Sequence, residues 1–396
     1  MHVAAADVRS FAEEGWSLVE VQGSCDARFT PVRDALAEQI RTGNELGAGL
    51  VVDIDGHTVV DIWGGRCDAG HRTPWSRDTI TNVWSTTKTV CNLAALMLVD
   101  RGQLDPYAPV AKYWPDFAAN GKEHIEVRHL LSHTSGVSGW ETPFCTEDTY
   151  DWDFATRRLA AQAPWWEPGT ASGYHAQNQG HLVGELVRRV TGKPMKAFVA
   201  DEIAGPLGAD FQIGAGEADW SRIAPITPPP PLPFDVAALD PQGPRFKTVV
   251  GPLPNAEAAN TPAWRHADLP ALNGHGNARS VARILKALAL GGTVDGVRLL
   301  SPDTIGVIFD EQSHGTDLIL DIPLRWGIGF VLPESESVPY VPQGRACYWG
   351  GWGGSLTVMD LDTRTTISYM MNKMASGIIG SDRSESYVRA IQSCLT

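Results

Sequence analysis

The sequence predicts an α/β (α+β) fold, in which an antiparallel β-sheet is flanked by helices and a mainly helical domain is inserted into the chain. Apolar, β-branched runs typical of strands lie towards both ends of the 396 residues, and helical spacing of apolar residues dominates the middle. Strands from the two ends are expected to join one sheet, because each must bury an apolar face. Residues 1–82 and 272–396 then form the sheet domain, and residues 83–271 the helical domain.

The predicted strands follow from runs of apolar and β-branched residues bounded by turn residues. Residues 47–63 read as a strand, a turn at Asp55-Gly56 and a second strand. Further strands are expected at residues 324–332, 346–349, 356–360 and 365–371.

The predicted helices rest on i, i+3, i+4 spacing. Val90, Leu93, Leu96 and Met97 form such a stripe in an amphipathic helix that opens at Ser85, with Gly102 as its stop. Other helices are expected at residues 125–132, 179–191, 278–290 and 384–394.

Residues 225–270 are rich in proline, with PPPPLP at residues 228–233. Proline lacks an amide N–H, so this segment cannot be a regular helix or a central strand. It is either an extended surface excursion or a wall or lid over a pocket, since long loops in compact domains are often functional.

The charge balance excludes several classes of partner. Lys and Arg number 32 and Asp and Glu 46, which gives a net charge of −14. A nucleic-acid-binding protein needs a basic face, and so does a protein that binds an anionic membrane surface. We therefore expect no nucleic-acid partner and no membrane partner; the oligomeric state stays undetermined.

The sequence also predicts a cytoplasmic protein. No run approaches the ~18 apolar residues of a membrane span, and residues 1–16 lack the basic and apolar regions of a secretory signal. The six cysteines include no C-x-x-C pair, so neither a zinc site nor a disulfide framework is expected.

One motif carries candidate chemistry, Ser85-Thr86-Thr87-Lys88, the only S-x-x-K in the chain. Three residues apart at a helix start, the hydroxyl and the amine lie on one face, where a neutral amine can activate the hydroxyl. Backbone N–H groups at a helix start also favour an oxyanion on an attacked carbonyl. The alternative is a Ser cap followed by a solvated Lys.

Two further segments support the chemical interpretation. In WWEPGTASGYHAQN, the Pro168-Gly169 turn delivers Tyr174, whose phenol can share a proton with a nearby amine. In WGGWGGS, repeated glycines between two predicted strands suggest a close approach of the backbone.

Together these segments resemble the penicillin-recognising serine hydrolases, and most closely the family VIII bacterial carboxylesterases, which are similar to class C β-lactamases. The resemblance rests on the order and spacing of the segments S-T-T-K (85–88), LLSHTSG (130–136), WEPGTASGYH (166–175), GGTVDGVRLLSPDTI (291–305) and YWGGWGGS (348–355). It implies the β-lactamase/transpeptidase-like fold.

The resemblance also implies roles for individual residues. Ser85 would be the acylated nucleophile, Lys88 its proton acceptor and Tyr174 the tyrosine of the Y-x-N element. The backbone N–H groups of Ser85 and Trp352 would form the oxyanion hole. Trp349, Gly350 and Gly351 would stand in place of K-T-G, and no metal or organic cofactor is implied.

Two departures point away from β-lactams as the main substrates. Trp349 cannot hold a carboxylate as the lysine of K-T-G does, and Ala176 replaces the asparagine of Y-x-N. Trp84 and Trp349 instead suggest apolar surface for an acyl or aryl group. His275 is a further candidate for the pocket edge, whereas His133 is expected to make a structural hydrogen bond.

The expected function is therefore that of a serine carboxylesterase (EC 3.1.1.-) acting on small-to-medium acyl esters through an acyl-enzyme on Ser85. One alternative keeps this nucleophile in a β-lactamase-like amide hydrolase or an acyltransferase. The other is a catalytically idle scaffold that binds a ligand.

Overall fold

The computed structural model of the protein describes residues 21–70, 72–231 and 234–395. Its largest feature is a nine-stranded sheet in the order β1-β3-β2-β14-β13-β12-β11-β10-β9, with every neighbouring pair antiparallel. The strands are β1 (Gln22–Cys25), β2 (Gly47–Ile54), β3 (His57–Gly65), β9 (Ser313–Thr316), β10 (Pro323–Trp326), β11 (Val331–Leu332), β12 (Ala346–Gly350), β13 (Leu356–Asp360) and β14 (Thr365–Met371). Pairing of β2 with β14 joins the two ends of the chain, and the predicted fold class is confirmed.

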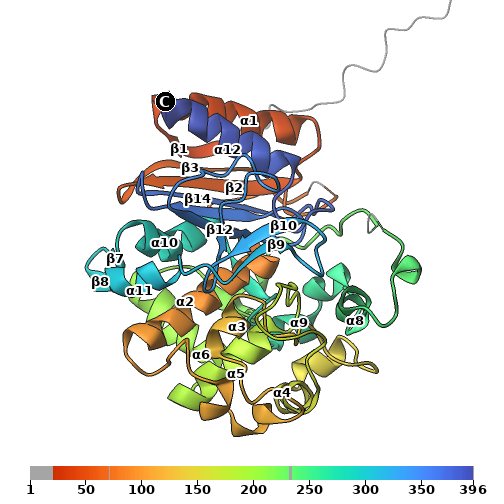
Figure 1. The fold of residues 1–396 in the computed structure, drawn as a ribbon. Helices are drawn as coiled ribbons and strands as arrows, with labels where there is room; N and C mark the ends of the chain where they lie inside the picture. Colours follow the sequence, from red (N-terminus) through yellow and green to blue (C-terminus); the bar gives the residue numbers. More distant parts are fainter. Residues whose placement is uncertain (1–20, 71, 232–233, 396) are drawn as a thin grey trace, which may run out of the picture.

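Helices cover both faces of the sheet (Figure 1). The helices α1 (Thr30–Arg41) and α12 (Asp382–Leu395) lie on one face, and α10 (Ala278–Ala289) packs on the other. Successive side chains of a strand point to opposite faces. Leu50 and Val52 of β2 accordingly pack in the cluster of α1 and α12, whereas Val51 packs in the cluster of α10.

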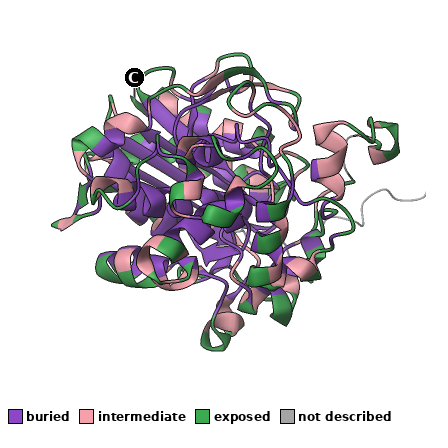
Figure 2. Ribbon diagram, turned by 60° about the horizontal axis from the view of Figure 1, so that its bottom comes forward, coloured by how far each residue is buried: buried purple, intermediate pink, exposed green. Residues whose placement is uncertain are grey.

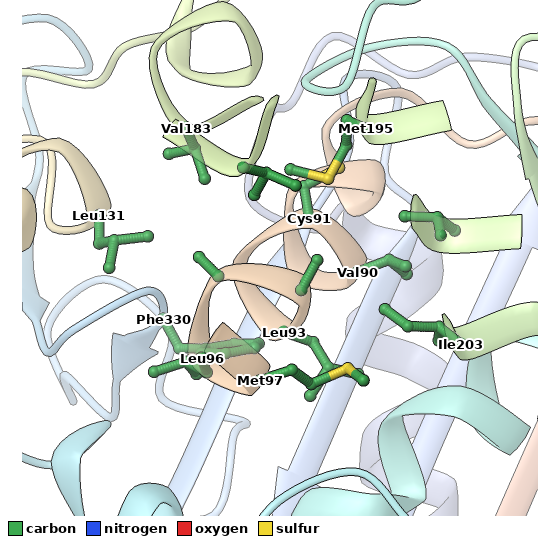
Figure 3. Close-up of a cluster of buried hydrophobic side chains, with 14 of the residues drawn as sticks. Val90, Cys91, Leu93, Leu96, Met97, Leu131, Val183, Met195, Ile203 and Phe330 are labelled. Atoms are coloured by element: carbon green, nitrogen blue, oxygen red, sulfur yellow. The ribbon is translucent and has the colours of Figure 1, made fainter. Parts of the chain in front are cut away.

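The helix α2 (Thr87–Asp100) lies at the centre of the helical part of the chain. Figure 3 shows its apolar side chains meeting residues from several other elements, among them Leu131, Val183, Met195, Ile203 and Phe330. Every residue from Thr87 to Leu98 is buried. The predicted helix is present, although it begins at Thr87 and not at Ser85. Its predicted amphipathic character is wrong, because elements pack around α2 on all sides.

The other helices of this part are α3 (Val127–Leu131), α4 (Trp152–Ala161), α5 (Gln179–Thr191), α6 (Met195–Val199) and α7 (Gly205–Leu207). The predicted helix at 179–191 has the same bounds as α5. The predicted helix at 125–132 is shorter, because Glu126 caps the start of α3. Neither α1 nor α4 was predicted.

Several smaller elements lie outside the nine-stranded sheet, and one strand prediction within that sheet is wrong. These smaller elements are α11 (Pro302–Val307), the pair β7 (Thr293–Val294) and β8 (Val297–Arg298), and a three-stranded sheet of β4 (Thr81–Asn82), β6 (Gly274–Gly276) and β5 (Gln212–Ile213). The single strand predicted at 324–332 is in fact the pair β10 and β11. The chain turns between them at Gly329, whose positive φ of 90° suits glycine.

The proline-rich segment is not extended throughout. It contains α8 (Pro244–Val250) and α9 (Pro262–His266), each of which begins at a proline. Proline is tolerated at the first position of a helix because that N–H needs no partner within the helix. The expectation of an extended excursion is therefore wrong for these residues.

Burial follows this layering: the central strands β2, β12, β13 and β14 are buried, whereas the edge strands β1 and β9 and the outer sides of peripheral helices are largely exposed (Figure 2). Among the described helices, none combines the length and apolar character that crossing a bilayer requires. Residues 1–16, in which no secretory signal is predicted, lie outside the described residues.

Candidate active site

Ser85 lies in a short 3-10 turn, Trp84–Thr86, directly before α2. The preceding residue, Trp84, has a φ of +49°, a conformation that is costly for a bulky side chain. Such strain persists only where the surrounding structure enforces it, and it often occurs at functional sites. The turn places Ser85 on the wall of a cavity.

The amine of Lys88 is buried beside Ser85. Its Nζ lies 2.9 Å from Ser85 Oγ, 2.8 Å from the carbonyl oxygen of Ala176 and 3.0 Å from that of Ala271. A neutral amine has two N–H donors and one lone pair. The two carbonyls can accept both N–H groups, which leaves the lone pair facing the Ser85 hydroxyl.

Burial also favours the neutral amine, and it lowers the pKa of Lys88 well below its ordinary value. Within the described part of the chain, no carboxylate pairs with this amine to oppose that effect. Desolvation is the main cause of this lower pKa, because the helix start itself is buried.

Tyr174 forms the third side of this group, with its ring centre 5.0 Å from Lys88 Nζ. Burial raises the pKa of Tyr174 above its ordinary value, while hydrogen bonds with Ser85 and Trp349 lower it in part. The phenol is therefore protonated at neutral pH, and it can donate a proton to an oxygen near Ser85.

The turn that carries Tyr174 is fixed by buried hydrogen bonds. The backbone N–H of Tyr174 donates to Asp317 Oδ1 at 3.0 Å, and the N–H of His175 donates to His133 Nδ1 at 2.9 Å. The side chain of His175 contacts Ser135 Oγ at 2.6 Å. His133 thus makes the structural hydrogen bond expected of it.

Trp349 does not reach the cavity, contrary to the prediction that its indole offers apolar surface to a substrate. It lies behind Tyr174, and its Nε1–H donates to the Tyr174 hydroxyl at 3.3 Å. The two rings are 4.9 Å apart, and Trp326 packs against the same indole at 4.9 Å. This packing makes Trp349 a positioning residue for the phenol.

Replacing Trp349 with Phe should lower kcat for a neutral ester about threefold to tenfold and leave KM nearly unchanged. The lost N–H donor is worth about 0.5–1.5 kcal/mol, and the remaining ring still packs on Tyr174. Steady-state kinetics with p-nitrophenyl butyrate measure both constants, after circular dichroism confirms the fold. A raised KM with unchanged kcat would instead show that Trp349 contacts the substrate.

Gly351 allows the end of β12 to approach the Ser85 turn. A Cβ atom at this position would lie 2.6 Å from the carbonyl oxygen of Val83 and 2.5 Å from Ser355 Oγ. Ser355 Oγ in turn lies 3.0 Å from Thr86 Oγ1, which ties the two segments together. Neither Ser85 nor Trp352 uses its backbone N–H in a hydrogen bond to another described residue.

The cavity at Ser85 has a volume of about 380 Å³. Its walls come from the Ser85 turn, the Tyr174 turn, the proline-rich segment, the loops after β9, β12 and β14, and the residues Thr146 and Leu272. They are mostly apolar, and the residues are Trp84, Ser85, Thr146, Tyr174, Ala176, Gln177, Phe234, Arg245, Thr248, Val249, Pro254, Asn255, Trp264, Leu272, Ile319, Leu320, Ile322, Trp352, Ser376, Gly377, Ile378 and Ile379. The proline-rich segment is therefore a wall of the pocket.

The structure brings together most of the residues that the sequence singled out. Ser85 and Tyr174 line the cavity with Trp84 and Trp352, and Lys88 lies behind Ser85. Gly350 and Gly351 do not line it; they form the end of β12 and the approach to the turn.

His275 is not at the pocket edge, so that prediction is wrong. It lies in β6 between β4 and β5, fully buried, and its Nδ1 contacts the carbonyl oxygen of Asn273 at 2.8 Å. Burial lowers the pKa of His275 to about 4. Pairing on both edges of β6 keeps this side chain away from the cavity.

The sequence did not reveal several residues that contribute to the site. The carbonyls of Ala176 and Ala271 hold Lys88, but a backbone oxygen leaves no residue-type signal in a sequence. Arg245 and Trp264 belong to the proline-rich segment, whose path no local pattern determines. In the part of the chain that the structure describes, no three His, Cys, Asp or Glu side chains gather as a metal-binding group.

Comparisons with known proteins show the family to which the chain belongs. Residues 32–385 match the family described as Beta-lactamase, a range that contains Ser85, Lys88 and Tyr174. Esterase/beta-lactamase LipL of Mycobacterium tuberculosis is 34% identical over 378 residues, which are 91% of this chain and 85% of LipL.

Two solved structures are similar over nearly the whole chain. A family VIII carboxylesterase superposes with a TM-score of 0.89 at 39% identity, covering 95% of this chain and 100% of that one. A penicillin-binding protein homolog from Caulobacter crescentus has a TM-score of 0.87 at 35% identity, with the same coverage.

Proposed function

Because the chain is a serine hydrolase of the beta-lactamase family, we propose that it is a carboxylesterase that forms an acyl-enzyme on Ser85. The observation that carries this proposal is the buried amine of Lys88, 2.9 Å from Ser85 Oγ, with its pKa well below the ordinary value. A hydroxyl next to a neutral amine is an activated nucleophile.

Acylation would begin with attack of Ser85 Oγ on the ester carbonyl while Lys88 Nζ takes the hydroxyl proton. The free N–H groups of Ser85 and Trp352 would hold the oxyanion of the tetrahedral intermediate. The C–O bond to the alcohol then breaks, and the alcohol leaves with a proton passed from Lys88 through the Tyr174 phenol.

Deacylation would repeat these steps with water in place of Ser85. Lys88 takes a proton from water, the hydroxide attacks the acyl carbonyl, and the oxyanion lies between the same two N–H groups. Ser85 Oγ leaves and recovers its proton from the Lys88 and Tyr174 pair, which releases the carboxylic acid.

The site favours an uncharged acyl ester over a β-lactam. Trp349, at the position of the K-T-G lysine, donates to Tyr174 and supplies no cation there. Ala176 offers no side-chain amide for an acylamide group, and its carbonyl is bound to Lys88. The apolar walls suit a small-to-medium acyl chain. The name of Esterase/beta-lactamase LipL includes both an esterase and a β-lactamase, so a β-lactamase-like hydrolase is the second candidate.

The expected result is efficient hydrolysis of p-nitrophenyl butyrate with weak turnover of nitrocefin. A charge-assisted contact is worth about 1.5–3 kcal/mol, so its loss costs a β-lactam roughly one to two decades in kcat/KM. Steady-state kinetics on both substrates measure the ratio. A kcat/KM for nitrocefin equal to or above that for the butyrate would favour the β-lactamase.

A further inference from the structure

Among the described residues that line the cavity, Arg245 is the one with a charged side chain. It lies in α8 (Pro244–Val250), and Thr248 and Val249 line the same cavity. Positions i, i+3 and i+4 share one face of a helix. This face of α8 therefore presents a cation to an otherwise uncharged pocket.

The guanidinium of Arg245 is only partly satisfied. Its Nη1 pairs with Asp321 Oδ2 at 2.9 Å, and its central carbon lies 4.8 Å from the ring centre of Phe234. Its Nε–H is buried and has no hydrogen-bond partner among the described residues. A buried donor without a partner is costly, and an oxygen of a ligand would remove that cost.

Asp321 does not neutralise this cation fully. The side chain of Asp321 is 68% exposed, whereas that of Arg245 is 27% exposed. Water around an exposed carboxylate weakens its attraction for a neighbouring cation. The charge of Arg245 is thus only partly compensated at the cavity wall, and its Nε–H has no partner among the described residues.

We propose that Arg245 binds a carboxylate of the substrate, in the part of the acyl or alcohol group that lies against α8. The substrate class is then an ester that also carries a carboxylate, such as a half-ester of a dicarboxylic acid. A guanidinium suits this role because its planar N–H groups match a carboxylate. The inference rests on the proposed esterase function and adds its substrate class.

The carboxylate proposed to bind Arg245 would occupy a different place from the carboxylate of a β-lactam. In the K-T-G pattern, the lysine that holds the carboxylate of a β-lactam would stand at the position of Trp349, which lies outside the cavity lining. The apolar loop residues Ile319, Leu320 and Ile322 would contact the chain between the ester and the carboxylate.

The test compares kcat/KM for matched pairs of charged and neutral esters. On the acyl side, these are the mono-p-nitrophenyl esters of adipic and suberic acids and the same esters with a terminal carboxamide. On the alcohol side, they are 4-carboxyphenyl butyrate and 4-carbamoylphenyl butyrate. We expect the carboxylate to be preferred about tenfold or more in one series, which identifies the side of the substrate that meets α8.

Two variants should move this preference in opposite directions. Arg245→Met should reduce the preference about tenfold or more. Asp321→Asn should increase it, because the competing carboxylate is removed; asparagine tolerates the φ of +60° at this position. The matched control is Arg389→Met on α12, where the arginine pairs with Glu385 and does not line the cavity. Its preference should equal that of the wild type.

The outcomes separate this inference from the proposed function. Hydrolysis of the neutral esters without a carboxylate preference, or with one that Arg245→Met does not change, would overturn the inference and leave the esterase standing. Absence of hydrolysis for every ester would overturn both.

Discussion

Ser85→Ala protein is expected to fold normally and to lose ester turnover by about 10³-fold or more. The change removes one oxygen at a cavity wall, and Lys88 keeps its hydrogen bonds to the carbonyls of Ala176 and Ala271. Without the nucleophile, only binding and the oxyanion-stabilising N–H groups remain, and their residual effect is small. Circular dichroism and a p-nitrophenyl butyrate assay measure the two properties.

Labelling with a fluorophosphonate makes this test sharper. The wild type should gain one adduct, on Ser85, and Ser85→Ala should gain none. Retention of more than about a few per cent of activity by the folded variant would show that Ser85 is not the nucleophile. A folded wild type that forms no adduct would favour the ligand-binding scaffold.

Lys88→Met should lose activity almost as completely as Ser85→Ala, because the two side chains act as one unit and their effects do not add. The methionine side chain is unbranched like that of lysine, but it has no amine and so supplies neither a lone pair on nitrogen nor an N–H donor. The carbonyls of Ala176 and Ala271 lose their partner, which costs roughly 1–3 kcal/mol of stability for each buried acceptor. Thermal unfolding must therefore accompany the kinetic assay.

The pH profile of the wild type tests the same assignment without a mutation. The active form has a neutral Lys88, so kcat/KM should rise as the amine loses its proton and then level off. Since burial lowers the pKa of Lys88, kcat/KM should rise at pH values well below the pKa of an ordinary lysine. Activity that is highest in acid and falls towards neutral pH would contradict Lys88 as the base.

Tyr174→Phe distinguishes the two candidate bases. Its loss of activity should be smaller than that of Lys88→Met, because burial raises the pKa of the phenol and keeps it protonated. A larger loss in Tyr174→Phe would transfer the role of base to Tyr174.

The sequence by itself determined the features that depend on local backbone geometry. Ser85 and Lys88 lie together because three residues span about one helical turn, whatever surrounds them. The periodic apolar residues of 179–191 and the alternating or β-branched runs at 356–360 and 365–371 gave elements with the observed bounds. These signals are short-range, and burial of a continuous apolar face reinforces each of them.

Only the tertiary structure decided what these residues contact. The carbonyls that hold Lys88 come from positions 88 and 183 residues further along the chain. Sheet packing turned Trp349 towards Tyr174, and strand pairing buried His275 away from the cavity. The path of the proline-rich segment through the fold brings Arg245 to the pocket wall. Such contacts depend on how distant elements pack, and the local spacing of residue types carries no record of that packing.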